Sequence, residues 1–207
     1  IKDNKLADEN SELNPLSLYA QSKVNAEKYI LSLINNTDMN PTILRFATAF
    51  GLSPRMRFDL TISEFTRDLS IGNDLNVYDA HTWRPYCHVR DFARLIEMVI
   101  EAPSEKVSFE VFNAGGDVNN ATKQMIVDII LEQIPNGKVS YQDHGSDPRN
   151  YRVNFQKVKS VLGFEPKYTV EDGVNELVNA INNHMFDHID KSRNFYGNYE
   201  INYPPQA

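Results

Sequence analysis

Tyr19 and Lys23 place a phenol and an ammonium four residues apart, in the stretch Tyr-Ala-Gln-Ser-Lys. Side chains at this spacing lie on one face of a helix, so a helix here would bring the two groups together. A lysine charge beside a tyrosine hydroxyl favours the phenolate, which can take a proton from an alcohol. The pair suits redox chemistry between an alcohol and a ketone, while the same spacing also occurs on helix faces that do no chemistry.

The sequence on both sides of this pair predicts the helix that would carry it. Residues 14–17 (Asn-Pro-Leu-Ser) supply turn chemistry for a helix start, and apolar residues then recur at helical spacing as far as Leu33. Residues 35–37 (Asn-Asn-Thr) end the pattern. The helix therefore begins just before Tyr19 and continues well past Lys23.

Two further segments predict strands whose ends could carry a site. Residues 41–51 form a short apolar run with β-branched residues, typical of a buried strand, that leads into a loop marked by Gly51. In open α/β sheets, ligands bind outside the carboxyl ends of such strands. Residues 75–91 predict a strand, a loop and a strand, with Asp91 as the cap of an apolar helix over 92–100. Apolar stripes predict core-facing helices over 58–71, 122–134 and 172–189.

Five stretches, taken in order, carry a resemblance to one family. The stretch that begins at Tyr19 resembles its catalytic YxxxK motif. Residues 44–51 resemble its arginine-led strand ending in Phe-Gly, and residues 83–91 resemble its R-D-Y-x-H-V-x-D segment. Residues 111–116 resemble its F-N-x-G turn. Residues 147–166 resemble its phosphate-binding arginine followed by a K-x-x-x-L-G-x-x-P helix. The chain is thus similar, over almost its whole length, to the extended short-chain dehydrogenases, specifically the NAD-dependent nucleotide-sugar epimerases and dehydratases.

This resemblance implies an α/β fold: the C-terminal portion of a Rossmann-like doubly wound parallel sheet, plus a small α/β substrate-binding lobe. Residues 1–52 would hold late Rossmann elements with the YxxxK helix, and residues 53–207 would hold the lobe, interleaved with the remaining Rossmann strands and helices. No Gly-rich turn precedes Tyr19, so the chain is expected to lack the N-terminal half that binds the dinucleotide phosphates. Gly115 and Gly116 have no G-x-G-x-x-G spacing around them and are interpreted as a turn that needs positive φ.

The function implied by the resemblance is sugar redox chemistry. Tyr19, as phenolate, would remove the proton of a sugar hydroxyl, usually at C4, while hydride passes to the nicotinamide of NAD. Lys23 would hold the nicotinamide ribose and tune Tyr19. The keto sugar would then be reduced on its opposite face, as in an epimerase, or lose water, as in a 4,6-dehydratase. NADP in place of NAD stays open, and the isolated chain is expected to be inactive.

Two alternatives to that function remain. One is a nucleotide-sugar 4-ketoreductase, and the other is a non-catalytic dinucleotide-binding sensor or scaffold of the same fold. The presence of both Tyr19 and Lys23 favours an enzyme, because a sensor has no need of the phenolate.

The resemblance also points to residues that would bind a nucleotide-diphosphate sugar. Arg84 and Arg149 fall on positions that resemble family contacts to the nucleotide or the diphosphate. Thr48 stands where many relatives carry an Asn that reaches the phosphate side of the substrate. Arg55 and Arg57 follow the strand-end loop, where their guanidinium donors could meet a diphosphate in place of that Asn, or could lie on a solvated surface.

Several other positions have both a structural and a functional interpretation. Arg45 lies inside an apolar strand, where an unpaired charge is costly, so it either forms an ion pair within the fold, which we favour, or points at a ligand. His88 is either packed or near the substrate. His184 and His188 have the i,i+4 spacing of helical metal ligands, but position 185 is not Glu and no third ligand is evident, so no metal is expected.

Composition narrows the class of protein and its compartment. A formal net charge of −7 argues against a nucleic-acid surface, and no stretch predicts a membrane span. The single cysteine, Cys87, excludes an internal disulfide and fits a reducing compartment, so a cytoplasmic protein is expected.

The resemblance implies two protein partners besides the sugar nucleotide. One is the N-terminal half of the same enzyme. The other is a second copy, because the family commonly pairs through a four-helix interface that includes the YxxxK helix. Tyr29, Ile30 and Leu33 would lie along that helix.

Overall fold

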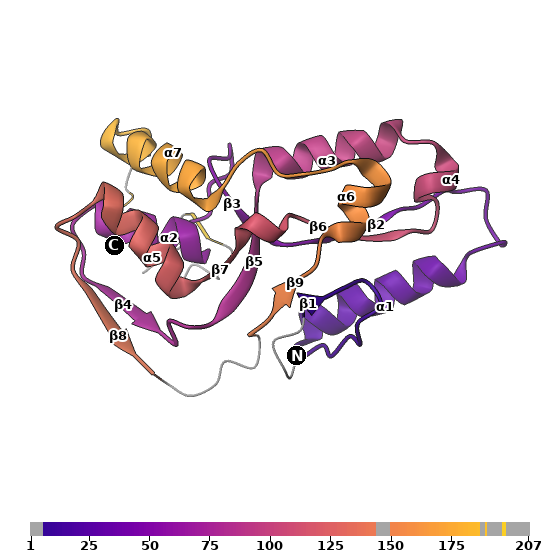
Figure 1. The fold of residues 1–207 in the computed structure, drawn as a ribbon, viewed down its shortest axis with the longest axis horizontal. Coiled ribbons are helices and arrows are strands. Elements are labelled where there is room, and N and C mark those ends of the chain that lie inside the picture. The colour runs from indigo at the N-terminus through magenta and orange to yellow at the C-terminus, as the bar shows by residue number, and fades with distance from the viewer. Residues whose placement is uncertain (1–5, 144–149, 187–188, 190–195, 198–207) are drawn as a thin grey trace, which may run out of the picture.

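The structure is a computed structural model that describes residues 6–143, 150–186, 189 and 196–197. Strands and helices alternate along most of the chain (Figure 1). The strands are β1 (Leu6–Ala7), β2 (Ile43–Phe46), β3 (Thr48–Phe50), β4 (Leu75–Tyr78), β5 (Trp83–His88), β6 (Val111–Ala114), β7 (Asn120–Thr122), β8 (Val139–Gln142) and β9 (Arg152–Val153). The helices are α1 (Leu18–Ser32), α2 (Thr61–Ser70), α3 (Val89–Glu101), α4 (Ser104–Val107), η2 (Asp117–Asn119), α5 (Lys123–Gln133), α6 (Gln156–Leu162) and α7 (Val170–Asn182).

Most of the strand pairs are parallel. β2 pairs with β6, β3 with β5, β4 with β8 and β1 with β9, and β5–β7 is the antiparallel pair among the described strands. The run predicted as one strand over 41–51 is two strands, because the chain changes partner at Ala47, whose N–H donates to the Ala114 carbonyl. β2 lies beside β6, whereas β3 lies beside β5. This change of partner carries the chain from one lobe of the molecule into the other.

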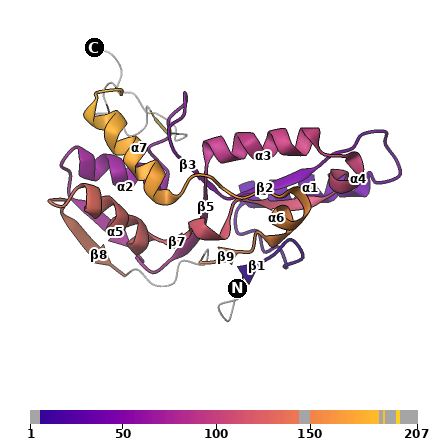
Figure 2. The ribbon, with the colours of Figure 1, turned by 45° about the horizontal axis from the view of Figure 1, so that its top comes forward.

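Two hydrophobic cores occupy the two lobes (Figures 1 and 2). In one core, α2, α5 and α7 pack together with β3, β4 and β5. In the other, α3 and α6 contribute Leu95 and Val158 to a cluster with Phe112 of β6 and Phe164. Residues of the first core come before, between and after those of the second in the sequence. The assignment of a substrate-binding lobe interleaved with Rossmann elements stays a prediction. The boundary at residue 52 stays a prediction.

Two predicted helix starts were displaced. α3 begins at Val89 and is capped by His88, whose Nδ1 accepts the Arg90 N–H at 3.1 Å, so Asp91 is not the cap. Asp91 is fully buried in the first turn, where its carboxylate accepts the backbone N–H groups of Lys167 and Tyr168. α7 begins at Val170, capped by Thr169, and ends at Asn182, well short of residue 189. The capping box at Thr169, rather than the apolar stripe, sets the start.

Gly115 and Gly116 were interpreted as needing positive φ, and this was wrong. In the described residues the glycines with positive φ are Gly51, Gly72 and Gly163. A Cβ on Gly115 would lie 2.7 Å from the Phe155 ring, and a Cβ on Gly116 would lie 2.4 Å from Pro166. Close packing, not backbone handedness, requires glycine at these two positions.

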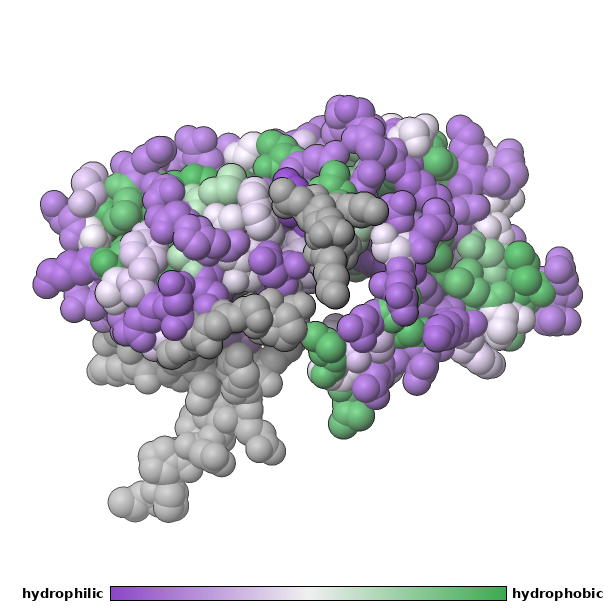
Figure 3. All heavy atoms as spheres, turned by 60° about the horizontal axis from the view of Figure 1, so that its bottom comes forward, coloured by the Kyte–Doolittle hydropathy of each residue, from purple (hydrophilic) through white to green (hydrophobic). Residues whose placement is uncertain are grey.

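Helix α1 lies on the surface of the molecule. None of its residues is buried, whereas α7 buries six. Figure 3, which brings the lower side of Figure 1 forward, shows apolar side chains at the surface near the end of the molecule where α1 finishes. The exposed large apolar side chains of α1 and its flanks are Leu16, Leu18, Tyr19, Tyr29 and Ile34. Among the described residues, no helix has the length and apolar character needed to span a bilayer.

Candidate functional site

Tyr19 and Lys23 lie in the first turns of α1, as predicted. The helix begins where the Ser17 hydroxyl caps it by accepting the Ala20 N–H at 3.2 Å. Tyr19 is 73% exposed, and the Lys23 Nζ lies 5.5 Å from the centroid of its ring. The two side chains therefore share one solvent-facing side of the helix, as the four-residue spacing requires.

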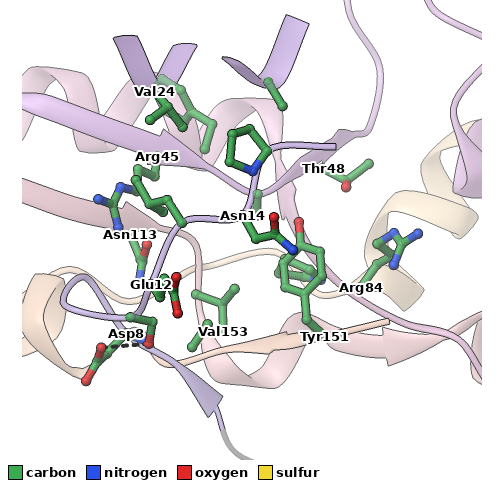
Figure 4. A pocket seen from close by; sticks show the side chains of 18 of the residues that line it. Asp8, Glu12, Asn14, Val24, Arg45, Thr48, Arg84, Asn113, Tyr151 and Val153 are labelled. Atoms are coloured by element: carbon green, nitrogen blue, oxygen red, sulfur yellow. Dashed lines mark hydrogen bonds between the residues drawn. The ribbon is translucent and has the colours of Figure 1, made fainter. Parts of the chain in front are cut away.

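A cavity of about 830 Å³ lies between α1, the segment that precedes it and the ends of β2, β5 and β9 (Figure 4). α1 contributes Ala20 and Val24 to its wall, while Tyr19 and Lys23 lie outside the lining. The charged and polar residues of the lining include Asp8, Ser11, Glu12, Asn14, Ser17, Arg45, Thr48, Arg84, Asn113, Asn150 and Tyr151. The cavity is thus lined by hydrogen-bonding groups from segments far apart in the sequence.

Two of the predicted substrate residues, Thr48 and Arg84, line this cavity together. Thr48 pairs in register with Tyr86 on the adjacent strand β5, which places Arg84 two residues from that point. The Arg84 guanidinium carbon lies 5.6 Å from the centroid of the Tyr151 ring. Tyr151 was not predicted from the sequence. The signal that could have identified it is its position two residues after Arg149, a predicted substrate contact. A cation held against an aromatic face suits an anionic or planar ligand group.

Arg55 and Arg57 do not line the cavity with Thr48. Arg57 forms a two-point ion pair with Asp59, in which Nε donates to Oδ1 at 2.8 Å and Nη2 donates to Oδ2 at 2.6 Å. The fork that was predicted to meet a diphosphate therefore meets a carboxylate of its own loop. Arg55 is exposed on the same loop.

His88 is packed, with a side chain that is 1% exposed. Its Nδ1 accepts the Arg90 N–H, which leaves Nε2 to donate to Oε2 of Glu176 at 3.0 Å. The imidazole also stacks on Tyr168, with ring centroids 4.5 Å apart. It lies outside the lining of the cavity, so of the two interpretations the packed one describes its position.

Three further predicted positions fall in the C-terminal third of the chain. Arg149 and His188 lie outside the described residues. His184 follows the end of α7 with a φ of +53°, so it is not on a helix face. In the part of the chain that the structure describes, no group of three His, Cys, Asp or Glu residues could hold a metal ion.

Arg45 forms an ion pair within the fold, which confirms the interpretation that we favoured. Its Nε donates to Oε2 of Glu27 at 2.9 Å, and its Nη2 donates to Oε1 at 2.5 Å. Its Nη1 donates to the backbone carbonyl of Glu9 at 3.0 Å. The hydrogen bond to Glu27 raises the pKa of Arg45, against the opposing effect of burial. Neither glutamate was selected from the sequence, although Glu27 lies one helical turn beyond Lys23.

Tyr19 and Lys23 fit one end of a nicotinamide dinucleotide. Within the described part of the chain, neither side chain makes a hydrogen bond or an ion pair with another residue, so both are available to a ribose or a substrate hydroxyl. Gly115 and Gly116 offer no cradle for the phosphates, because Phe155 and Pro166 fill the space beside them. Tyr19 and Lys23 could therefore hold the nicotinamide ribose, whereas Gly115 and Gly116 could not hold the pyrophosphate.

Comparisons of the sequence with known proteins gave consistent matches. A model described as the NAD dependent epimerase/dehydratase family matches residues 2–115. A dTDP-glucose 4,6-dehydratase of an Actinoplanes species is 29% identical over 174 residues, covering 82% of this chain and 52% of the relative. A UDP-glucuronate 4-epimerase of Thermodesulfobacterium geofontis is 26% identical over 170 residues, covering 80% and 50%. The chain spans about half the length of these curated relatives.

Solved structures of 4,6-dehydratases and 4-epimerases also align with this chain. The dTDP-glucose 4,6-dehydratase of Bacillus anthracis, in complex with NAD, aligns with a TM-score of 0.76 and 27% identity, over 89% of this chain and 58% of that one. The UDP-glucuronic acid 4-epimerase of Bacillus cereus, in complex with UDP-glucuronic acid and NAD, aligns with a TM-score of 0.75 and 20% identity, over 87% and 57%. The α/β, Rossmann-like fold expected from the sequence is therefore confirmed.

Proposed function

The chain belongs to the NAD dependent epimerase/dehydratase family, and from this membership we propose that it supplies the catalytic and substrate-binding part of a nucleotide-sugar epimerase or 4,6-dehydratase. The observation that carries the proposal is the Tyr19–Lys23 pair, exposed on α1 beside a cavity that holds Thr48 and Arg84. The same helix bears the pair and part of the cavity wall. A sugar held in the cavity could therefore reach toward the phenol.

The chemistry assigned to these residues is proton transfer at a sugar hydroxyl. Tyr19 Oη takes the proton of the C4 hydroxyl, and Lys23 stands beside the phenol with its Nζ 5.5 Å from the ring centroid. NAD, when bound, would supply the hydride acceptor and donor for C4. Tyr19 then holds the proton and gives it back to the C4 oxygen when the keto sugar is reduced. Lys23 also holds the nicotinamide ribose by donating hydrogen bonds from its Nζ.

The substrate proposed for the cavity is a nucleotide-diphosphate sugar. Arg84 offers a guanidinium fork, and Thr48 offers a hydroxyl from the junction of β2 and β3. Arg149 stays a proposed second contact to the diphosphate. Arg55 and Arg57 stay proposed contacts on the loop after β3, and an Arg55→Ala variant with an unchanged KM would remove Arg55 from the site.

His88 is retained in the proposal as a residue that acts through its neighbours. The hydrogen bond from its Nε2 orients the Glu176 carboxylate, which also accepts the Leu52 N–H at 2.9 Å. We infer that His88 supports the loop after β3 through Glu176 and does not itself contact the sugar.

Epimerisation and dehydration diverge only after the keto sugar has formed. Tyr19, Lys23, Thr48 and Arg84 serve both reactions, because C4 oxidation is common to them. A nucleotide-sugar 4-ketoreductase would use the same pair in the reducing direction. A non-catalytic sensor is disfavoured by the free Tyr19 and Lys23 side chains, which have no structural task within the described residues.

The proposed assembly has two parts beyond this chain. The dinucleotide phosphates would be held by a Gly-rich N-terminal half, which fits relatives of which this chain matches only about half. A second copy would cover α1, where Tyr29 is 67% exposed, with Ile30 and Leu33 beside it. We place the protein in the cytoplasm on the strength of its single, free Cys87.

The decisive experiment compares wild type with Tyr19→Phe, in protein that has the length of its relatives and includes the dinucleotide-binding half. Each is given NAD with dTDP-glucose, UDP-glucose or UDP-glucuronic acid, and products are identified by mass spectrometry and NMR. We expect turnover of one sugar by wild type and a loss on the order of 10²–10⁴ in kcat for Tyr19→Phe. Tyr141→Phe is the matched control, because Tyr141 lies on β8 away from the cavity.

Each outcome of this comparison is informative. An inverted C4 centre identifies an epimerase, and a 4-keto-6-deoxy product identifies a dehydratase. A 4-keto sugar formed together with an equivalent of NADH identifies a ketoreductase that runs in reverse. Equal activity of wild type and Tyr19→Phe would refute the role of the phenol. Native mass spectrometry of the same sample weighs the assembly and any bound dinucleotide, which tests the proposed partner copy.

A further inference from the structure

The helix that bears the proposed catalytic pair has little hydrophobic anchorage. α1 buries no residue, and its half-buried side chains include Ala20, Val24 and Leu31. A catalytic group that is displaced by about 1 Å can lose on the order of 10² in rate. Some other interaction must therefore fix the rotation of α1 about its own axis and its position along that axis relative to β2.

The Glu27–Arg45 ion pair has the geometry to do this. Two parallel hydrogen bonds join the carboxylate to the guanidinium, at 2.9 and 2.5 Å, and such a fork fixes orientation as well as distance. The Glu27 side chain is 12% exposed and that of Arg45 is 21% exposed, so solvent screens the pair only in part. A pair of this kind resists both rotation and sliding of the helix.

Glu27 also stands in the right place on α1. Tyr19, Lys23 and Glu27 form an i, i+4, i+8 row, in which each step turns the side chain by only about 40° around the axis. Glu27 lies about 12 Å along the helix from Tyr19. A constraint at Glu27 is therefore transmitted to Tyr19 and Lys23 through two turns of rigid helix.

Arg45 is itself held in place by the sheet and by the segment before α1. It pairs in register with Asn113 of β6, and its Nη1 donates to the Glu9 carbonyl. The Glu9 carboxylate accepts the Asn113 backbone N–H at 2.8 Å, which closes the arrangement. One guanidinium thus joins β2, the approach to α1 and the middle of α1.

We propose that Glu27 and Arg45 are positioning residues, which hold Tyr19 and Lys23 at the correct height and rotation relative to the cavity. This inference rests on the proposed function of Tyr19 and Lys23. Neither Glu27 nor Arg45 touches the reacting sugar in this arrangement. Their effect is on where the phenol and the ammonium stand.

The kinetic test uses Glu27→Gln and Arg45→Lys in protein that includes the dinucleotide-binding half. Gln keeps the shape of Glu27 but loses its charge and one acceptor, while Lys keeps the charge of Arg45 but loses the fork. We expect kcat to fall by about 10- to 100-fold in Glu27→Gln, with KM for the sugar nucleotide within about twofold. We expect kcat to fall in Arg45→Lys as well, again with little change in KM. Glu97→Gln, an exposed carboxylate on α3, is the matched control and should match wild type.

A second measurement does not depend on activity. Hydrogen exchange of the 207-residue chain should show faster exchange in Glu27→Gln across the α1 amides, with the amides of α7 unchanged. Loss of protection in both helices would indicate general destabilisation and would overturn the inference. Unchanged kcat, or a raised KM with unchanged kcat, would overturn it as well.

The two proposals can fail separately. If wild type turns over no sugar nucleotide, the proposed function fails, and the exchange of α1 alone then decides whether the ion pair fixes the helix. If wild type is active and Glu27→Gln equals it in kcat and in exchange, the positioning role fails while the function stands.

Discussion

The Nε2 atom of His88 lies 3.0 Å from Oε2 of Glu176, although 88 residues separate them in the chain. The same carboxylate accepts the Leu52 N–H at 2.9 Å and pairs with Arg90 at 2.8 Å. Glu176 thus joins α7 to the end of β5 and to the loop that comes after β3. This arrangement holds together the carboxyl ends of β3 and β5, whereas Thr48 and Arg84 line the cavity near the opposite ends of these strands.

Glu176→Ala should destabilise the fold by about 2–3 kcal/mol, because it leaves the buried His88 Nε2 and the Leu52 N–H without their acceptor. Urea denaturation followed by circular dichroism measures the change, with an unaltered m-value expected. Glu132→Ala, an exposed carboxylate on α5, should stay within about 0.5 kcal/mol of wild type. A similar small change for Glu176→Ala would show that the three contacts contribute little.

Gly51→Ala should be more damaging than Gly72→Ala. Both glycines have positive φ, +96° and +80°, so both substitutions carry a backbone cost of about 1–2 kcal/mol. A Cβ on Gly51 would lie 2.1 Å from His88 Nε2, whereas one on Gly72 would meet nothing within 4 Å. The additional loss at Gly51, of about 1–3 kcal/mol, measures the clash with His88. Equal unfolding midpoints for the two variants would argue against that contact.

The capping box of α7 should make stability fall in acid. Hydrogen bonds from the backbone and side chain of Thr169 lower the pKa of Asp172 below its usual value. A lowered folded-state pKa stabilises the protein above the unfolded value of about 4, and the benefit is lost as pH falls through the folded-state pKa. We expect the Tm of wild type to fall more steeply than that of Asp172→Asn below about pH 4. Parallel Tm curves would contradict this assignment.

The thiol of Cys87 should be unreactive in the folded protein. Burial, with a smaller contribution from the Asp91 charge, raises the pKa of Cys87 to about 12. At pH 8 the thiolate is then rarer by a factor on the order of 10³ than in an exposed cysteine. Labelling with a chromogenic disulfide should be slow for the native chain and complete at once in guanidinium. Fast native labelling would place Cys87 at the surface.

Local patterns predicted the elements well where one signal was sufficient. The helix that carries Tyr19, the strands of 75–91 and the helix over 122–134 were all found where the pattern placed them. The ends of elements were less predictable, because they depend on side chains that find distant partners. Asp91 has the residue type of a cap, yet it serves the backbone of Lys167 and Tyr168, and His88 caps α3 in its place.

The sequence by itself determined the chemistry available to this protein. The Tyr19–Lys23 spacing, the motifs at 44–51 and 83–91 and the family membership all come from residue order, because helical and strand periods are local properties. Only the tertiary structure decided which side chains are committed to the fold. Arg45 is paired with Glu27 and Arg57 with Asp59, while Arg84 lines the cavity and also donates from Nη1 to the Trp83 carbonyl at 3.1 Å. The partner of Arg45 lies 18 positions away and is set by tertiary packing, which no local pattern encodes.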